Sequence, residues 1–500
     1  MNYVSRFEPW SHQRDALDKM GDRNAFALLM AMRTGKTKTL LDNWGALEAK
    51  GECDDLLVIA PAGVYKTWEK AVKDHLAPAL LARVNVFTWS ASLRSRERYK
   101  VLLEQFLRDH SRPRILLVNV EALSNVQDAR SVSYNFLEQR KSMLAIDEST
   151  TIKNPTAKRT RYINMVLKEK ANYRRILTGL PTPKSPLDIY SQFEFLDPKI
   201  LGHRSYRSFR ARYAVTQRMQ LTGRKAFDVV VGFRDVEEIQ DRIQDHSFRV
   251  RLEDCYDLPP KMYTIREVPL TDEQKRAYNE IKEFATTQLD NMEHVTAQQV
   301  ITQILRMHQV LCGHVGTENG GYADIPEHRT KTLIDLLDEH EGKSIIWCSY
   351  DTDIRKVSME LEYHTLREAW QEGQPPVRVD ESNLKHVARF WGGNRETRED
   401  EEFKFLNDPD CRYMVATAAA GGRGRTWTVA DMVVYYSNTA DLEHRSQSEE
   451  RAQGVDKTTS VLYVDLVAPG TVDEKMLKTL RAKINMAATI TADSWREWVI

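Results

Sequence analysis

The sequence contains no apolar run that approaches the roughly 18 consecutive residues of a membrane-spanning helix. Its first ten residues, MNYVSRFEPW, lack the apolar stretch of a signal peptide. The chain is also poor in cysteine: its five cysteines are scattered, with no CxxC pair and no Cys/His cluster. A zinc-finger site or a disulfide framework is therefore not expected, and we predict a reducing, cytoplasmic location.

The chain has no net charge either, because 72 basic residues balance 72 acidic ones. Overall charge thus gives no argument for a nucleic-acid partner, although local basic patches could still bind phosphates. We find no internal repeat, low-complexity tract or long charged tail. With 41% hydrophobic residues, the 500-residue chain fits a globular protein of two or three domains, each with its own core.

Short apolar runs of strand length occur in two groups, with longer charged, helix-compatible segments between them. Buried strands that alternate with helices indicate parallel sheets, so we predict an α/β protein with two lobes. The first group comprises residues 26–31, 56–60, 115–120, 143–147 and 175–179, and the second comprises 344–349, 413–417, 432–437 and 461–468.

The stretch between the two groups, from about residue 197 to 325, is polar and reads as largely helical. The sequence DLPPK at 257–261 interrupts it, since paired prolines cannot continue a helix, and we place the crossing between lobes there. The predicted domains are a first lobe at 1–200, a mostly helical insertion and linker at 201–325, a second lobe at 326–470 and a helical segment at 471–500.

The sequence AMRTGKTKT at 31–39 resembles a nucleotide-phosphate loop, in which G-x-x-x-x-G-K-[ST] is usual, but Met30 stands where the first glycine belongs. The triplet GKT at 35–37 follows a strand candidate and precedes a helix-like segment, as a phosphate cradle requires. Lys36 would contact the β- and γ-phosphates of ATP, and Thr37 would coordinate Mg²⁺. By itself, GKT is also compatible with a basic loop that caps a helix.

An acidic pair at the end of a strand, in MLAIDEST at 143–150, supplies the second half of such a site. Asp147 would hold Mg²⁺ through water, and Glu148 would orient or deprotonate the attacking water. A DE pair after a strand is often only part of a helix N-cap. Together with Lys36, it predicts an ATP and Mg²⁺ site.

Several segments then resemble one family. LAIDESTTIKNPTAKRTR at 144–161 resembles the DEAH-x-x-IKN signature of Swi/Snf-type ATPases, a branch of the superfamily-two helicases. FEPWSHQRDAL resembles their entry motif, LLVIAPAGVYKTWEKAV carries their tryptophan and glutamate as Trp68 and Glu69, and RRILTGLPTPKSPLDIYSQFEFLDP is close to their LTGTP segment. The resemblance covers about residues 7–482.

This resemblance implies two RecA-like lobes with parallel sheets and helical insertions, with ATP between the lobes and the nucleic acid lying across both. Family members keep only the final glycine, lysine and threonine of the phosphate loop, which accounts for Met30, and Arg33 stands where many have glycine. The implied nucleotide-binding residues are Gln13, which would read adenine, and Thr34, Gly35, Lys36, Thr37, Gly422, Gly424 and Gln447; Thr178 and Gly179 would couple the ATP site to the nucleic acid.

The resemblance also assigns a catalytic arginine, Arg451, which matches the first arginine of the family's Q-x-x-D-R-x-H-R-x-G-Q motif. The second arginine, usually the finger, falls at Gly454, and the GQ pair becomes Asp456 and Lys457. Three explanations stay open: Arg451 acts alone, Arg423 or Arg425 substitutes, or hydrolysis is slow until a partner helps.

Two basic stretches are candidate nucleic-acid contacts, since lysine and arginine bind the phosphate backbone without reading sequence. A solvated charged face is the alternative for both. The candidates are Lys153, Lys158, Arg159 and Arg161 in the first stretch, and Arg204, Arg207 and Arg210 in the second.

We therefore predict an ATP-driven translocase on DNA, duplex or branched, that acts as a monomer without membrane contact. A strand-separating or branch-remodelling helicase and an ATP-dependent clamp with weak hydrolysis are the alternatives. The sequence shows no chromodomain-, bromodomain- or finger-like addition, and this favours a bare motor from a phage or bacterium, in the cytoplasm of the bacterial or infected cell.

Overall fold

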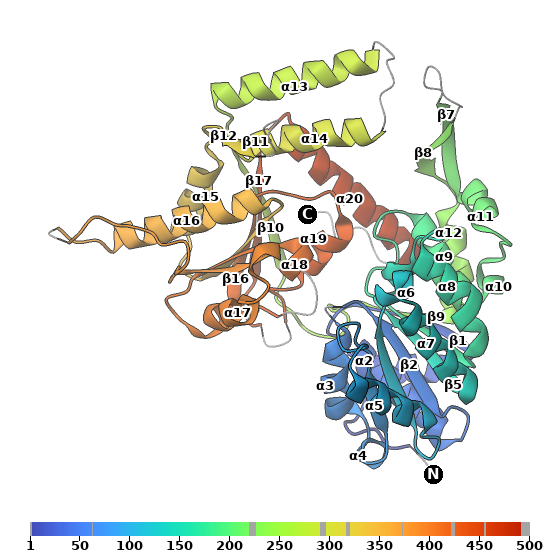
Figure 1. Cartoon of the computed structure of the whole chain (residues 1–500). Coiled ribbons are helices and arrows are strands. Elements are labelled where there is room, and N and C mark those ends of the chain that lie inside the picture. Colours follow the sequence, from blue (N-terminus) through green and yellow to red (C-terminus); the bar gives the residue numbers. More distant parts are fainter. Residues whose placement is uncertain are drawn as a thin grey trace. The chain divides into compact units, whose positions relative to one another are not determined.

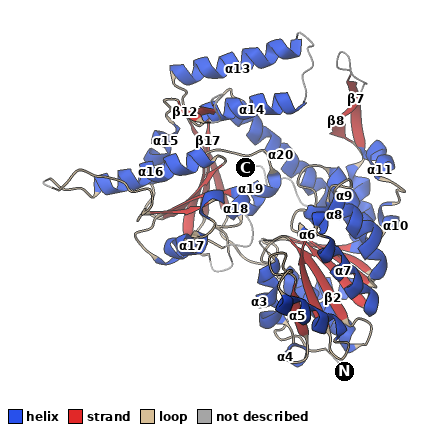
Figure 2. Cartoon of the chain, viewed as in Figure 1, coloured by secondary structure: helices blue, strands red, loops and turns tan. Residues whose placement is uncertain are grey.

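The computed structural model describes residues 3–62, 64–219, 227–290, 297–316, 321–372, 374–421, 426–454 and 457–491. Contacts divide the chain into two compact units. The first unit is built mainly from residues 1–215 and 230–257, and the second mainly from 216–229 and 258–484. The main chain thus passes from the first unit to the second at Asp257 and Leu258. Each unit has a central sheet between helices (Figures 1 and 2).

The first unit contains a seven-stranded sheet in which every neighbouring pair is parallel. Its strands, in spatial order, are β3 (Asn85–Thr88), β4 (Arg114–Asn119), β2 (Asp55–Ala60), β5 (Ser142–Asp147), β6 (Tyr173–Leu177), β1 (Ala25–Met30) and β9 (Ser247–Val250). The inner strands are apolar on both faces because helices cover both. Alternate residues enter opposite cores: Leu57 and Ile59 lie in one, Leu56 and Val58 in the other.

Twelve α-helices of the described residues belong to the first unit, and they complete both of its cores. They are α1 (Ser11–Met20), α2 (Lys36–Ala49), α3 (Tyr65–His75), α4 (Pro78–Leu81), α5 (Glu97–Arg108), α6 (Ala122–Asn125), α7 (Gln127–Gln139), α8 (Lys158–Tyr162), α9 (Ile189–Leu196), α10 (Pro198–Leu201), α11 (Tyr206–Tyr213) and α12 (Val236–Ile243).

The second unit contains a six-stranded sheet, again parallel at every neighbouring pair. In spatial order its strands are β10 (Lys261–Glu267), β17 (Val461–Val467), β16 (Ala430–Tyr435), β13 (Lys343–Cys348), β15 (Tyr413–Thr417) and β14 (Val387–Phe390). Its helices are α13 (Asp272–Asp290), α14 (Ala297–Leu311), α15 (Arg329–Asp338), α16 (Asp351–Glu368), α17 (Arg398–Asn407), α18 (Ala418–Gly421), α19 (Leu442–Glu449) and α20 (Val472–Thr491).

All nine strands that the apolar runs predict are present, and the fold class, two RecA-like α/β lobes, is confirmed. Strands β3, β9, β10 and β14 are the edge strands of the two sheets, and they carry no long apolar run. The stretch from 197 to 325 holds helices α10–α14, of which α13 and α14 lie side by side (Figure 1), and two small sheets: β7 (Ala214–Met219) with β8 (Phe227–Phe233), and β11 (His314–Gly316) with β12 (Tyr322–Asp324). Among the described residues, none of the helices combines the length and the hydropathy that a membrane crossing needs.

Candidate nucleotide-binding and nucleic-acid sites

The phosphate loop, residues 31–35, connects the end of β1 to the start of α2, as the sequence predicts. Gly35 is the N-cap of α2 with φ 85°, a left-handed conformation that favours glycine. The Lys36 ammonium is buried and donates hydrogen bonds to the carbonyl oxygens of Met30 at 2.8 Å and Ala31 at 3.0 Å. Arg33 also has a positive φ, 65°, so the loop adopts a backbone that glycine would take more easily.

Gln13, at the start of α1, packs directly on this loop. Its Nε2 donates to the carbonyl oxygen of Thr34 at 3.2 Å, and Nε2 of His12 lies 2.8 Å from the same oxygen. A Cβ atom added to Gly35 would lie only 2.2 Å from Nε2 of Gln13. Gly35 therefore meets two requirements, a left-handed backbone and the close approach of α1.

The acidic pair lies at the carboxyl end of β5. Asp147 is 6% exposed, and its Oδ2 accepts a 2.9 Å hydrogen bond from the indole Nε1 of Trp68 in α3. Its Oδ1 accepts from the backbone N–H of Glu148, which follows with φ 48°. Burial raises the pKa of the Asp147 carboxyl, while the nearby Lys36 ammonium and the Trp68 hydrogen bond act to lower this pKa. The structure thus brings Lys36 and Asp147 to the same edge of the sheet.

Thr178 and Gly179 follow β6, the strand that separates β5 from β1. The backbone N–H of Thr178 donates to the carbonyl oxygen of Leu28, and its hydroxyl accepts from Leu180. Gly179 packs against the phosphate loop, since a Cβ atom there would lie 3.5 Å from Cα of Ala31. The coupling loop, residues 178–181, therefore touches the loop that carries Lys36.

Arg249 in β9 is a residue of this site that the sequence analysis missed. Its Nη1 donates to the carbonyl oxygens of Leu29 at 3.1 Å and Gly179 at 2.6 Å. One guanidinium group thereby joins the end of β1, just before the phosphate loop, to the coupling loop. The short strand SFRV around Arg249 carries no pattern that reveals this contact, which depends on β9 pairing with β1.

In the second unit, Gln447 lies in α19 and Arg451 follows that helix. Arg451 is 1% exposed, and its Nε donates to the carbonyl oxygen of Gln447 at 2.9 Å. Lys457, which replaces the motif glutamine, forms an ion pair with Asp431 at 2.6 Å. The predicted residues Gly422, Arg423, Gly424 and Arg425 lie outside the described residues, as does Asp456.

The first basic stretch borders an open hollow on the first unit, of about 550 Å³. Lys158 and Arg161 are both exposed and both line it, beside Met165, which is 73% exposed. Arg159 lies differently, because its Nε donates to the backbone carbonyl of Thr151 at 2.8 Å. Lys153 is half-buried. Two of the four predicted cations therefore share one surface.

The second basic stretch includes α11. Two of its aromatic residues, Phe209 and Tyr213, are core residues because both are 0% exposed, whereas Tyr206 is half-buried. Arg204 and Arg207 are exposed, and Arg210 is half-buried. The neighbouring Arg212 pairs with Asp235 and Glu238 of the same unit, which offsets its charge. Phe209 and Tyr213 thus anchor α11 and are not available to stack on bases.

Comparison with known proteins gives sequence relatives that are much longer. TATA-binding protein-associated factor MOT1 of Saccharomyces cerevisiae is 23% identical over 87% of this chain and 24% of its own length. Chromodomain-helicase-DNA-binding protein 1-like of Mus musculus is 23% identical over 86% of this chain and 43% of its own length. An uncharacterized ATP-dependent helicase of Mycoplasma genitalium is 21% identical over 92% of this chain and 40% of its own length. The chain spans less than half of each of these relatives.

Among solved structures, the SWI2/SNF2 ATPase core of Sulfolobus solfataricus in complex with dsDNA is similar to this chain. It is 22% identical, with a TM-score of 0.41, and the comparison covers 100% of this chain and 97% of that one. The SNF2-related domain matches residues 13–315, which is more than half of the chain and includes the phosphate loop, the acidic pair and the coupling loop. The chain therefore belongs to the SNF2-related family.

Proposed function

We propose that this chain is a DNA-dependent ATPase that uses ATP hydrolysis to move along double-stranded DNA. The observation that carries the proposal is the convergence of Lys36, Asp147 and the coupling loop at one edge of the first sheet. Membership of the SNF2-related family supports an ATP-driven motor. The exposed cations Lys158 and Arg161 beside the hollow supply a surface for the phosphates of DNA.

The residues at this edge fit the chemistry of phosphoryl transfer, which relies on positioning and charge neutralisation. On ATP binding, Lys36 exchanges its two carbonyl partners for phosphate oxygens, and the helix N-terminus of α2 adds its backbone N–H groups. Thr37 and, through water, Asp147 would hold Mg²⁺, which neutralises charge on the phosphates. Glu148 orients the attacking water, and Gln13 selects adenine.

The contact between the two loops supports coupling to nucleic acid. A shift of the phosphate loop on hydrolysis is passed to residues 178–181 through Gly179 and through the guanidinium of Arg249. DNA held by Lys158, Arg161, Arg204 and Arg207 then responds to the nucleotide state. Double-stranded DNA is the proposed substrate because the sequence resembles the branch of the family that translocates on duplexes.

A clamp with weak hydrolysis is the second candidate, and two observations favour it. Gly454 stands where the family has its second arginine, and the side chain of Arg451 is almost fully buried. An arginine finger contributes roughly 10³–10⁵ in rate, so its absence would leave nucleotide binding intact with slow turnover.

The test is a comparison of ATP hydrolysis without nucleic acid and with single-stranded DNA, duplex DNA, a branched junction and RNA. Lys36→Ala is the blank, and Lys50→Ala, at the exposed end of the same helix, is the matched control. Stimulation by duplex DNA that is lost only in Lys36→Ala supports the translocase. A preference for the junction favours branch remodelling, and nucleotide-dependent DNA binding without turnover favours the clamp.

Four earlier predictions belong to this proposal and need tests of their own: the monomeric state, the cytoplasmic location, the phage or bacterial origin and the absence of membrane contact. The relatives named above come from a yeast, a mouse and a mycoplasma, so they do not indicate a phage or bacterial origin for this chain. Analytical ultracentrifugation of the purified chain, with and without DNA, tests the monomeric state directly.

A further inference from the structure

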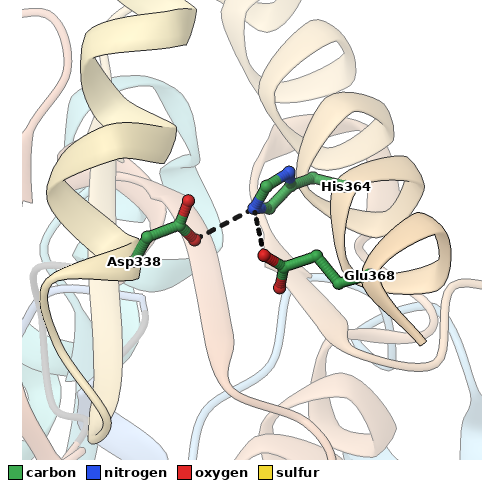
Figure 3. A group of neighbouring side chains, drawn as sticks. All are labelled: Asp338, His364 and Glu368. Carbon is green, nitrogen blue, oxygen red and sulfur yellow. Dashed lines mark hydrogen bonds and ion pairs between the residues drawn. The ribbon is translucent and has the colours of Figure 1, made fainter.

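Three side chains with metal-binding atoms meet at the ends of two helices in the second unit, away from the motifs of the ATPase core. Asp338 is the last residue of α15, while His364 and Glu368 lie one turn apart at the end of α16. Nε2 of His364 lies 2.9 Å from Oδ1 of Asp338 and 3.5 Å from Oε1 of Glu368, as Figure 3 shows. All three ligand atoms lie within 4.8 Å of one another.

The separation between His364 and Glu368 matches an edge of a tetrahedral zinc site, and that between His364 and Asp338 is close to one. Zinc binds nitrogen and oxygen ligands at about 2.0–2.2 Å, so two ligands on a tetrahedron lie roughly 3.4 Å apart. The edge from His364 to Glu368 already has this length, and the edge from His364 to Asp338 needs to lengthen by only about 0.5 Å. Side-chain rotation can supply such a change, since the side chain of His364 is 25% exposed, that of Glu368 61% and that of Asp338 41%.

The local electrostatics also favour a cation. Both carboxylates stand at the carboxyl ends of helices, where unpaired backbone carbonyls already carry partial negative charge. The last turn of α15 contains no basic residue, and that of α16 contains only Arg367. Two helix ends and two carboxylates therefore concentrate negative potential on the imidazole of His364.

The ligand set selects the type of ion. Calcium and magnesium prefer sites made entirely of oxygen, whereas an imidazole with two carboxylates suits zinc and similar first-row ions. We propose that Asp338, His364 and Glu368 bind one Zn²⁺ ion, with water as the fourth ligand. Within the described part of the chain, no other group of His, Cys, Asp and Glu has this geometry.

The proposed ion would connect α15 to α16 beyond their apolar contact. Both helices pack into the same core of the second unit, α15 through Leu333 and Leu337 and α16 through Val357 and Leu361. The three ligands lie just past these residues, at the outer ends of both helices. Zinc bound there stabilises the second unit, and this effect does not depend on the proposed ATPase function.

The test is a titration of the metal-free full-length chain with Zn²⁺ by calorimetry and with Co²⁺ by visible absorption, in excess Mg²⁺ and without nucleotide. The chain has 13 histidines, so a matched control is needed. His364→Ala removes the nitrogen ligand, and Asp338→Asn removes one carboxylate. His328→Ala changes an exposed histidine at the other end of α15.

We expect one tightly bound ion per chain, Co²⁺ bands of tetrahedral intensity, and a higher melting temperature with Zn²⁺. The affinity should fall at least tenfold in His364→Ala and Asp338→Asn and stay unchanged in His328→Ala. Circular dichroism of each metal-free variant confirms that it is folded. Equal affinity and equal Co²⁺ spectra in wild type and His364→Ala would overturn the proposal, as would the absence of binding in the wild type.

Discussion

The indole N–H of Trp68 donates a 2.9 Å hydrogen bond to the carboxylate of Asp147, so α3 holds the acidic group that ends β5. Asp147 is nearly fully buried and its pKa is raised by burial. A donor to the ionised carboxylate opposes that shift and fixes the direction of the carboxylate oxygens. Trp68 is therefore a positioning residue for the proposed Mg²⁺ site.

Trp68→Phe keeps the aromatic packing and removes this hydrogen bond. A bond to a charged group contributes about 1.5–3 kcal/mol, so we expect the Mg²⁺ concentration for half-maximal ATP hydrolysis to rise roughly 10-fold or more. The affinity should also become more sensitive to acid, because the Asp147 pKa rises further. Trp44→Phe is the control, since Trp44 is as buried as Trp68 and its indole nitrogen has no hydrogen-bond partner among the described residues. Equal effects in the two variants would refute the positioning role.

Arg249→Met keeps an unbranched side chain and removes the guanidinium that joins the carbonyls of Leu29 and Gly179. We expect DNA to stimulate ATP hydrolysis several-fold less than in the wild type, with little change in hydrolysis without DNA, because the loops lose a connection and Lys36 is untouched. Arg251→Met, two residues along the chain, removes an ion pair with Asp254, three residues away, and serves as the control. The coupling role fails if the ratio of stimulated to basal rates is unchanged in Arg249→Met.

Gly35 and Gly51 form a matched pair, because both have positive φ, 85° and 73°. A Cβ atom at Gly51 meets none of the described residues within 4 Å, whereas one at Gly35 would lie 2.2 Å from Gln13. Gly51→Ala should therefore cost only the backbone strain, about 1–2 kcal/mol of the free energy of unfolding. Gly35→Ala should cost more and weaken ATP binding. Urea unfolding and nucleotide titration of both variants measure this, and equal stability losses would show that Gln13 moves aside freely.

A buried pair in the second unit predicts a specific pH dependence of stability. Burial raises the pKa of Asp353 to about 7 and lowers the pKa of His314 to about 4. Nδ1 of His314 lies 3.4 Å from Oδ1 of Asp353, and Ser437 donates to the other carboxylate oxygen. Arg329, Lys356 and Glu327 act on the Asp353 pKa as well, and Lys356, His308 and Asp324 on that of His314.

The two groups affect stability in opposite directions. Asp353 keeps its proton in the folded chain, so its contribution is largest below about pH 4 and is lost as the pH rises to 7. His314 resists protonation in the folded chain, so its contribution is present above about pH 6.5 and is lost as the pH falls to 4. Between about pH 4 and 6.5, the contribution of Asp353 to the free energy of unfolding falls with rising pH, whereas that of His314 increases.

Asp353→Asn removes the first contribution and can keep the contact with Ser437. Melting temperatures of the variant should therefore rise more steeply from pH 4 to 6.5 than those of the wild type. The stability of the variant relative to that of the wild type should also be greater at pH 8 than at pH 5. At pH 8 the wild type buries an ionised Asp353 carboxylate, which the variant lacks. Parallel pH profiles for the two proteins would contradict the raised pKa of Asp353.

The sequence predicts the central strands and the phosphate loop because burial on both faces leaves continuous apolar runs and because Lys36 follows such a run. Strand β9 escapes prediction, since its four residues carry an arginine and lie at a sheet edge. The contact between Arg249 and Gly179 is equally hidden, because it joins a side-chain guanidinium to a backbone carbonyl 70 positions away in the sequence. Phe209 and Tyr213 of α11 lie among the arginines of the second basic stretch, and their spacing of four residues places both side chains in the core.

The measurement that tests the central claim most directly is displacement of the third strand from a DNA triplex by the 500-residue chain. Movement along the duplex removes the third strand without separating the other two. We predict displacement that requires hydrolysable ATP and a free length of duplex, is lost in Lys36→Ala and persists in Lys50→Ala. A chain that hydrolyses ATP in the presence of duplex DNA yet leaves the triplex intact would contradict the translocase.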